Sequence, residues 1–267
     1  MQVVNEEEPL MSENNLSPSL QQGLNEPGNP VWYASWFDTP YYHILYKDRD
    51  YEEAGMFMDN LTSYLNLPEG AKILDLACGK GRHSLYLNKL GFEVTGADLS
   101  SNSIREAAVF ENPTLHFVVH DMRIPFQQKF DAVFNLFTSF GYFEDDDDNV
   151  TTLKAIRDSL GEYGFAVIDF MNVDFVLENL VPEETKEVDG ITFHIKRYLK
   201  DNHIFKEISF EDHRQSFHFT EKVKALRLSD FETMMEEAGI FLLDVFGDYK
   251  LRKFYKNQSE RLIMIFK

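Results

Sequence analysis

ILDLACGKGRHS, at Ile73–Ser84, and VTGADLS, at Val94–Ser100, are the two segments of this chain from which its architecture follows. The apolar run that opens the first segment predicts a buried parallel strand, and the glycines after it predict a tight turn into a helix over Arg82–Leu90. Gly79 and Gly81 carry no Cβ atom, so the backbone leaves room for a ligand there, and the N–H groups of the helix point back at it. We therefore expect a ligand site where this strand ends.

A second apolar strand is predicted over Phe92–Ala97, and it ends on Asp98. In doubly wound α/β sheets, a carboxylate at this position is well placed to accept hydrogen bonds from both hydroxyl groups of a ribose. The first strand also ends on an acid, Asp75, which repels a pyrophosphate but attracts an amino group or a sulfonium. Either acid could merely cap a turn, but two acids at successive strand ends favour a site for a nucleoside with a cationic tail.

The order of these motifs resembles that of the class I S-adenosylmethionine-dependent methyltransferases, and the resemblance covers roughly residues 33–267. It implies an α/β fold with a Rossmann-like, doubly wound sheet of seven strands, of which the last is antiparallel. A small antiparallel β insertion is expected after the fifth strand. The expected domains are a disordered acidic segment over 1–30 and a methyltransferase domain over 31–267, in which an insertion over 173–226 covers the substrate.

The resemblance also implies which residues bind the cofactor, S-adenosyl-L-methionine. In the family, the glycine-rich loop wraps the methionine part, and the acid after the second strand binds the ribose. A segment after the third strand clamps the adenine, here with the carboxylate of Asp121, which is also a common turn residue. A segment after the fourth strand lies beneath the sulfonium. The implied residues are Asp75, Ala77, Cys78, Gly79, Gly81, Arg82, His83, Asp98, Leu99, Ser100, Asp121, Met122, Arg123, Asn135, Leu136 and Phe137.

A densely aromatic segment, WYASWFDTPYYHILYKDR, precedes the nucleotide fold at Trp32–Arg49. It is either a helix that packs its rings on the sheet or a lid over the cofactor, as in many small-molecule methyltransferases. For a lid, tyrosine hydroxyls can line a sulfonium pocket and an arginine can pair with the methionine carboxylate. The residues that we assign to the cofactor in this segment are Tyr33, Tyr46 and Arg49.

Methyl transfer requires the protein to hold the acceptor in line with the S–CH₃ bond and to exclude water. A base is needed only if the acceptor arrives protonated, with a pKa well above the ambient pH. The candidate catalytic residues are Tyr42, His43 and Tyr142, and no motif assigns a role to any of them. The single cysteine, Cys78, is expected to fill space in the cofactor loop rather than to act as a nucleophile.

The acidic run Glu144–Asp148 resembles a metal site at first sight. We interpret it instead as the first turn before a helix over Asn149–Leu160, because the helix dipole favours negative charge there. Attraction of a cationic acceptor to this run remains an alternative.

After the fifth strand, predicted over Phe165–Asp169, apolar and polar residues alternate at period two. This alternation predicts antiparallel strands over Ile191–Leu199, His203–Glu211 and Gln215–Ala225. The histidines of this region have no ligand-type spacing, so we expect no metal. The remaining expected elements are a helix over Phe231–Ala238 with a capping box of Ser229 and Glu232, and strands over Phe241–Phe246 and Arg261–Phe266.

The formal net charge of −19 argues against nucleic acid, which needs a basic stripe to neutralise its phosphates. No lysine or arginine occurs before Lys47, and no apolar run approaches the length of a membrane span, so we expect a cytoplasmic protein without a membrane partner. The 24 phenylalanines and 12 tyrosines suffice to line an apolar pocket.

With the resemblance, these features predict a methyltransferase that transfers a methyl group to a nitrogen or oxygen of a small-molecule acceptor. Whether it forms a homo-oligomer is left open. One alternative is a regulatory protein that binds S-adenosylmethionine or S-adenosylhomocysteine without turnover. Another is a protein or tRNA methyltransferase, for which the acidic surface would favour a basic protein partner. An open, flat pocket would favour a macromolecular acceptor, and a closed aromatic pocket would favour a small one.

Overall fold

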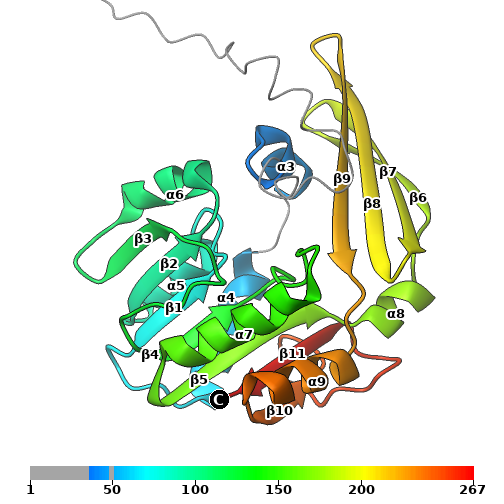
Figure 1. The fold of residues 1–267 in the computed structure, drawn as a ribbon. Helices are drawn as coiled ribbons and strands as arrows, with labels where there is room; N and C mark the ends of the chain where they lie inside the picture. Colours follow the sequence, from blue (N-terminus) through cyan, green and yellow to red (C-terminus); the bar gives the residue numbers. More distant parts are fainter. Residues whose placement is uncertain (1–35, 48–50) are drawn as a thin grey trace, which may run out of the picture.

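The computed structural model describes residues 36–47 and 51–267, which contain two β-sheets (Figure 1). The larger sheet has seven strands in the order β10-β11-β5-β4-β1-β2-β3. Its strands are β1 (Lys72–Leu76), β2 (Glu93–Asp98), β3 (Leu115–Val119), β4 (Phe130–Asn135), β5 (Leu160–Met171), β10 (Leu242–Phe246) and β11 (Arg261–Phe266).

The central strands of the larger sheet are parallel, and β11 runs antiparallel to both β5 and β10, as the resemblance implied. In the register of the sheet, Leu74 of β1 lies opposite Thr95 of β2 and Val133 of β4. The carboxyl ends of these three strands therefore lie side by side, and the loops that follow them meet at one edge.

Helices cover both faces of this sheet. One core contains residues of α4 (Tyr51–Tyr64), α5 (Arg82–Lys89) and α6 (Ser101–Ala107), and a short 3₁₀ turn, η1 (Ala108–Phe110), follows. The other core contains residues of α7 (Asp146–Ser159) and α9 (Leu228–Ala238). Ile73 belongs to the first core, whereas Leu74 and Leu76 belong to the second. Burial on both faces explains why β1, KILDL, is apolar at Ile73, Leu74 and Leu76.

The smaller sheet has four antiparallel strands in the order β6-β7-β8-β9 and follows α8 (Val173–Glu178). Its strands are β6 (Glu183–Val188), β7 (Ile191–Lys200), β8 (His203–Asp212) and β9 (Gln215–Lys224). The alternating pattern predicted the last three. Sequence reasoning missed β6 because this edge strand, EETKEV, is mostly exposed and carries few apolar residues.

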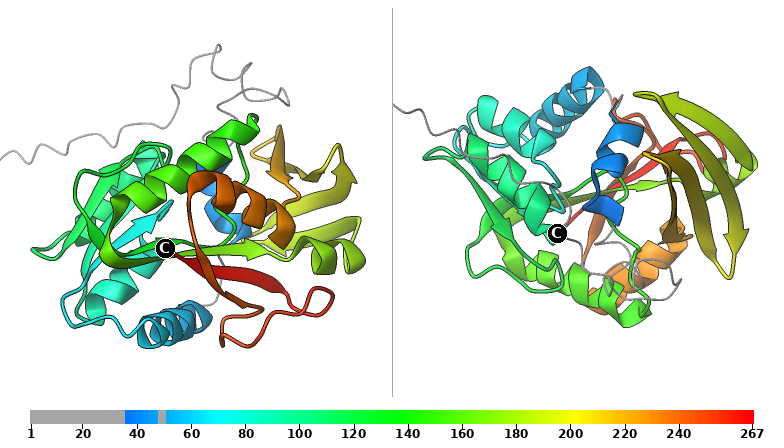
Figure 2. Two further views of the ribbon diagram at one scale, coloured as in Figure 1. Left: turned by 60° about the horizontal axis from the view of Figure 1, so that its bottom comes forward. Right: turned by 90° about the horizontal axis from the view of Figure 1, so that it is seen from above.

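The aromatic segment forms α3 (Pro40–Leu45), which packs on the smaller sheet and not on the larger one. Trp36 and Leu45 share a core with Phe193 and Phe210 of that sheet, and the Trp36 ring lies 4.5 Å from the ring of Phe219 between centroids. Figure 1 and the right view of Figure 2 place α3 between α6 and β9.

Three predicted boundaries were wrong. Helix α7 begins at Asp146 rather than Asn149, because the carboxylate of Asp145 accepts a hydrogen bond from the backbone N–H of Asp147 at 3.1 Å and caps it there. Strand β5 begins at Leu160 rather than Phe165, although the glycines of LGEYG suggested a turn.

The capping box of α9 also differs from the prediction. The side chain of Asp230 accepts a hydrogen bond from the backbone N–H of Arg227 at 2.7 Å, so the helix begins at Leu228 and the pair Ser229 and Glu232 does not form the cap. Within the described part of the chain, no helix is both long and apolar enough to cross a membrane.

Candidate functional site

A cavity of about 500 Å³ lies where the loops after β1, β2, β3 and β4 meet α3 and β9. Its size is within the range of sites for cofactors and small ligands. The predicted residues that line it are Tyr42, His43, Tyr46, Ala77, Cys78, Gly79, Arg82, His83, Asp98, Leu99, Ser100, Asp121, Met122, Leu136, Phe137 and Tyr142.

Four predicted residues lie behind this wall instead of in it, namely Asp75, Gly81, Arg123 and Asn135. The amide of Asn135, for example, is buried and donates a hydrogen bond to the carbonyl oxygen of Leu76 at 3.1 Å, which ties the end of β4 to the end of β1. Tyr33 and Arg49 lie outside the described residues.

The two glycines of the loop after β1, Gly79 and Gly81, have different structural roles. At Gly79, φ is +56° and no atom lies within 4 Å of the position that a Cβ would take, so the backbone is open toward the cavity. At Gly81, φ is +79° and a Cβ would lie 2.6 Å from the ring of Phe117. The expectation that both glycines leave room for a ligand therefore holds for Gly79 alone, whereas Gly81 lets Phe117 of β3 pack against the loop.

Asp98 is held at the end of β2 by two backbone donors. Its carboxylate accepts hydrogen bonds from the N–H of Gly79 and from the N–H of Ser100, both at 2.8 Å. Burial raises the pKa of this carboxyl, and the two N–H groups oppose the shift. The carboxylate thus links the loop after β1 to the start of α6 while its side chain lines the cavity.

Asp75 lies beneath the loop and is 1% exposed. Its carboxylate accepts a hydrogen bond from the hydroxyl of Ser84 at 2.6 Å, which ties β1 to the first turns of α5. Burial raises its pKa to about 6, against the lowering effect of the Ser84 hydroxyl. We expected this acid to face a cationic ligand, but it acts from the layer below, by positioning the loop.

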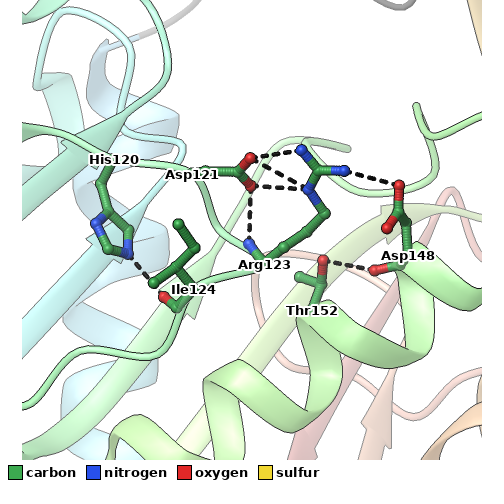
Figure 3. A network of polar contacts seen from close by, with 6 residues as sticks. All are labelled: His120, Asp121, Arg123, Ile124, Asp148 and Thr152. Carbon is green, nitrogen blue, oxygen red and sulfur yellow. Dashed lines mark hydrogen bonds and ion pairs between the residues drawn. The ribbon is translucent and has the colours of Figure 1, made fainter.

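The segment after β3 is held by a charged network, in which Arg123 joins two acids (Figure 3). Its guanidinium lies 2.6 Å from a carboxylate oxygen of Asp121 and 2.8 Å from one of Asp148, at the start of α7. The hydrogen bonds from Arg123 lower the pKa of Asp121. Arg123 therefore keeps Asp121 charged and turned toward the loop, while Asp121 and Met122 line the cavity.

The segment after β4 has an unusual backbone. Phe137 and Thr138 both have positive φ, +65° and +60°, which costs free energy for residues other than glycine. The buried Asp169 of β5 holds this turn: its carboxylate accepts from the N–H of Phe137 and its carbonyl oxygen from the N–H of Thr138, both at 2.9 Å. Arg261 pairs with the Asp169 carboxylate at 2.7 Å and donates to the Thr138 hydroxyl at 3.1 Å. Sequence reasoning missed both residues of this pair.

Tyr249, in the loop between β10 and β11, belongs to the same support. Its ring stacks on Phe137 at 5.9 Å between centroids, and its hydroxyl donates to Asp169 at 3.3 Å. Burial and the nearby Asp169 raise the pKa of this tyrosine. Tyr249 thus supports the Phe137 turn from behind, and it does not line the cavity.

The α3 segment connects the two halves of the site. Asp38 accepts hydrogen bonds from the hydroxyl of Ser100 and the amide of Asn102, at the start of α6. On the other side, the Tyr46 hydroxyl donates to Glu221 of β9 at 2.7 Å. With one end on α6 and the other on β9, the segment borders the cavity, where the lid interpretation would place it.

The acidic run is used in capping and ion pairing. Beyond the cap at Asp145, Glu144 pairs with Lys222 of β9 at 2.7 Å and Asp146 pairs with Lys224. These pairs fasten the start of α7 to the smaller sheet. Over 36–47 and 51–267, no three His, Cys, Asp or Glu side chains are placed to hold a metal ion.

The cavity wall also contains His120, from the predicted adenine segment, and Ser139, a further candidate of the sequence for the transfer site. Sequence reasoning missed several other residues of the wall, namely Phe37, Lys47, Lys80, Ser103, Thr138, Phe143 and Glu221. Most of them occupy loops whose course depends on the fold. Glu221 is different, because it sits in register with Phe217, Phe219 and Val223 on β9, where period-two alternation calls for an apolar residue. A charge at such a position was a signal available in the sequence.

Comparison with known proteins agrees with this geometry. A family model described as "Methyltransferase domain" matches residues 73–164. A glycine/sarcosine N-methyltransferase of Aphanothece halophytica is 33% identical over an alignment of 218 residues, and the match covers 78% of this chain and 78% of that protein. A putative methyltransferase of Bacillus subtilis, YqeM, is 27% identical over 219 residues, covering 74% of this chain and 88% of that protein.

Among solved structures, an S-adenosylmethionine-dependent methyltransferase from Clostridium acetobutylicum superposes with a TM-score of 0.72. The match is 23% identical and covers 88% of this chain and 97% of that one. At 23% identity, this similarity shows a common fold and no more.

Proposed function

This chain belongs to the class I S-adenosylmethionine-dependent methyltransferases, and on that premise we propose that it binds S-adenosylmethionine in the described cavity and methylates a nitrogen or oxygen of a small molecule. The observation that carries the proposal is the placement of Asp98. Its carboxylate stands at the end of β2, lines the cavity, and is fixed by the N–H groups of Gly79 and Ser100. A fixed carboxylate in this place suits the two hydroxyls of a ribose.

The other wall residues fit the rest of the cofactor. The open backbone at Gly79 admits the methionine part, and Asp121 with Met122 offers a hydrogen-bond acceptor and an apolar side chain to the adenine. Leu136 and Phe137 would lie beneath the sulfonium. When bound, the cofactor supplies a methyl group that is already activated for transfer.

Three features support a small acceptor. The cavity is bordered by α3 and β9 and is rich in aromatic side chains, namely Phe37, Tyr42, Tyr46, Phe137, Tyr142 and Phe143. The relative that is 33% identical is named for glycine and sarcosine, which are small amines. The net charge of −19 does not suit a nucleic acid acceptor. We propose that the smaller sheet, within the insertion 173–226, covers the acceptor.

The chain's own contribution to methyl transfer is positioning and exclusion of water. Holding an acceptor in the reactive geometry can lower the barrier by about 7–11 kcal/mol. We propose that Tyr42 and Tyr142, whose rings both contact Phe37, shape the acceptor side of the cavity. His43 also lines it and would take up a proton only from an acceptor that arrives protonated.

Calorimetric titration with S-adenosylmethionine, S-adenosylhomocysteine and NAD tests the cofactor. We expect both sulfur compounds to bind and NAD not to bind. Asp98→Asn removes the charge that accepts the ribose hydroxyls, and a hydrogen bond to a charged group contributes about 1.5–3 kcal/mol, so Kd for S-adenosylhomocysteine should rise by roughly 10- to 150-fold.

Asp131→Asn is the matched control for this substitution. Asp131 also accepts a backbone hydrogen bond, from the N–H of Lys72 at 2.8 Å, but it lies at the amino-terminal end of the sheet, away from the cavity. An unchanged Kd in Asp98→Asn would overturn the ribose assignment, and binding of NAD alone would overturn the proposed cofactor.

A further inference from the structure

Among the residues that the structure describes, three carboxylates line the cavity, and the proposed cofactor accounts for two of them. Asp98 and Asp121 follow β2 and β3, where the nucleoside is expected. The third, Glu221, lies on β9 of the smaller sheet, on the other side of α3 (Figure 1). Glu221 lines the cavity away from the residues expected to bind the nucleoside. We therefore expect it to contact the methyl acceptor, which would occupy the cavity beside the cofactor.

Glu221 interrupts the apolar face of the smaller sheet. Its register neighbours along β9 are Phe219 and Val223, and its partner across the strands is Lys206 of β8, which likewise lies between apolar residues, Ile204 and Ile208. A charged pair thus occupies an otherwise apolar face. Such a pair is costly to bury, and well-packed apolar residues in its place are often neutral or stabilising. The fold itself therefore gives no reason for it.

The hydrogen bonds that the carboxylate of Glu221 accepts reach one of its two oxygens. Its Oε1 accepts hydrogen bonds from the indole N–H of Trp36 at 2.8 Å and from the Tyr46 hydroxyl at 2.7 Å, and Lys206 in turn donates to that hydroxyl. The Glu221 side chain is 18% exposed, so these donors fix its carboxylate in a position that is largely shielded from solvent.

The second oxygen, Oε2, accepts no hydrogen bond from any residue within 36–47 and 51–267. Within the described ranges, the cation nearest to it is the ammonium of Lys206, which is 4.0 Å away and so beyond hydrogen-bond distance. Glu221 belongs to the cavity wall and Lys206 does not, so an acceptor meets the carboxylate and not the ammonium. An N–H group is the natural partner for such an oxygen. The Lys206 ammonium lies over the Tyr46 ring, 4.4 Å from its centroid, whereas the neighbouring ring of Tyr42 also lines the cavity and suits a cation.

We propose that Glu221 selects the methyl acceptor and that the acceptor carries an amine. The inference rests on the proposed function and specifies its substrate class. Oε2 accepts an N–H of the acceptor, while Trp36 and Tyr46 hold the carboxylate in place. Glu221 acts by recognition and takes no part in the transfer of the methyl group.

Matched pairs of compounds, in which a hydroxyl replaces the amine, test the proposal. Release of S-adenosylhomocysteine is measured with glycine against glycolate, ethanolamine against ethylene glycol, and glucosamine against glucose. We expect turnover with at least one amine and at least tenfold slower turnover with its hydroxyl counterpart. Equal or faster turnover of the hydroxyl compounds, or no turnover of any amine, would overturn the proposal.

Variants then assign the effect to Glu221. In Glu221→Gln, an amide N–H faces the acceptor N–H, so kcat/KM for the amine should fall at least tenfold while Kd for S-adenosylhomocysteine stays within twofold. Tyr46→Phe removes one of the donors that hold the carboxylate and should raise KM for the amine in a protein that keeps its fold. Unchanged kcat/KM in Glu221→Gln would contradict the assignment.

Glu207→Gln is the control. Glu207 also accepts a tyrosine hydroxyl, from Tyr198 at 2.8 Å, but it lies on the neighbouring strand outside the cavity wall, so activity should not change. The cofactor titration distinguishes a failure of the proposed function from a failure of the role proposed for Glu221. A wild-type protein that binds neither sulfur compound fails the proposed function, whereas one that binds them without preferring amines fails this inference alone.

Discussion

Removal of the Arg261 guanidinium should strongly destabilise the fold. Arg261 pairs at 2.7 Å with Asp169, whose side chain is fully buried, and the arginine side chain itself is only 18% exposed. In Arg261→Met the carboxylate keeps its hydrogen bonds from Phe137 and Tyr249 but loses its charge partner. Breaking a buried pair from one side typically costs about 3–5 kcal/mol, because a buried charge is left uncompensated.

Urea-induced unfolding, followed by circular dichroism, measures this loss. For a domain of this size, each kcal/mol lowers the melting temperature by about 2–4 °C, so a thermal scan should show a decrease of roughly 6–20 °C. Arg252→Met is the matched control, since Arg252 pairs with Asp248 at the surface with a side chain that is 74% exposed. Exposed pairs contribute about 0–1 kcal/mol, and the control should stay within that range.

A double variant tests the cause. If the uncompensated charge is responsible, replacing Asp169 by Asn in the Arg261→Met background should recover part of the lost free energy of unfolding. A loss below about 1 kcal/mol in Arg261→Met, or one equal to that of the surface control, would contradict this prediction, because the pair would then contribute no more than an exposed one.

Two further predictions concern the loop after β1. Gly81→Ala places a Cβ 2.6 Å from the Phe117 ring and should lower the free energy of unfolding by about 1–3 kcal/mol more than Gly70→Ala does. Gly70 is the control, because its φ is also positive, at +74°, but no atom lies within 4 Å of the position of its Cβ. Equal losses in the two variants would mean that backbone strain alone, and not the contact with Phe117, causes the loss. The pKa of Asp75, raised by burial to about 6, means that the native state binds more protons than the unfolded state between about pH 4 and 6, so this acid lowers stability as pH rises through that window. The advantage of Asp75→Asn over the wild type in unfolding free energy should therefore grow from pH 4 to 7, by at most about 3 kcal/mol, and an advantage that shrinks with pH would contradict the sign.

Local pattern was enough to predict the central architecture. The apolar run before Asp75, the glycines after it and the acid at Asp98 predicted a parallel sheet with a ligand site at its carboxyl edge. The resemblance to a known family supplied the seven strands and the antiparallel last strand that the structure shows. These features depend on neighbours in sequence, namely burial of a strand on both faces and the backbone freedom of glycine, so a single chain carries them.

Boundaries were less accurate where two local rules competed. The glycines of LGEYG suggested a turn, yet Leu160 already pairs with Phe130 in the sheet. Strand β6 escaped notice because an exposed edge strand has no apolar face to show. The apolar pattern of a strand reflects which of its faces are buried against other elements, and these segments are largely exposed.

What the sequence determined by itself is the set of side chains offered to the site, and what the tertiary structure decided is the layer in which each one acts. Asp75 and Asp98 are both acids at strand ends, but burial under the loop makes the first a support, whereas the second lines the cavity. Asp169 and Arg261 are 92 residues apart and meet only because β11 inserts beside β5. Lone-pair directions, burial and charge pairing depend on atoms brought together from distant parts of the chain, so no local pattern could assign these roles.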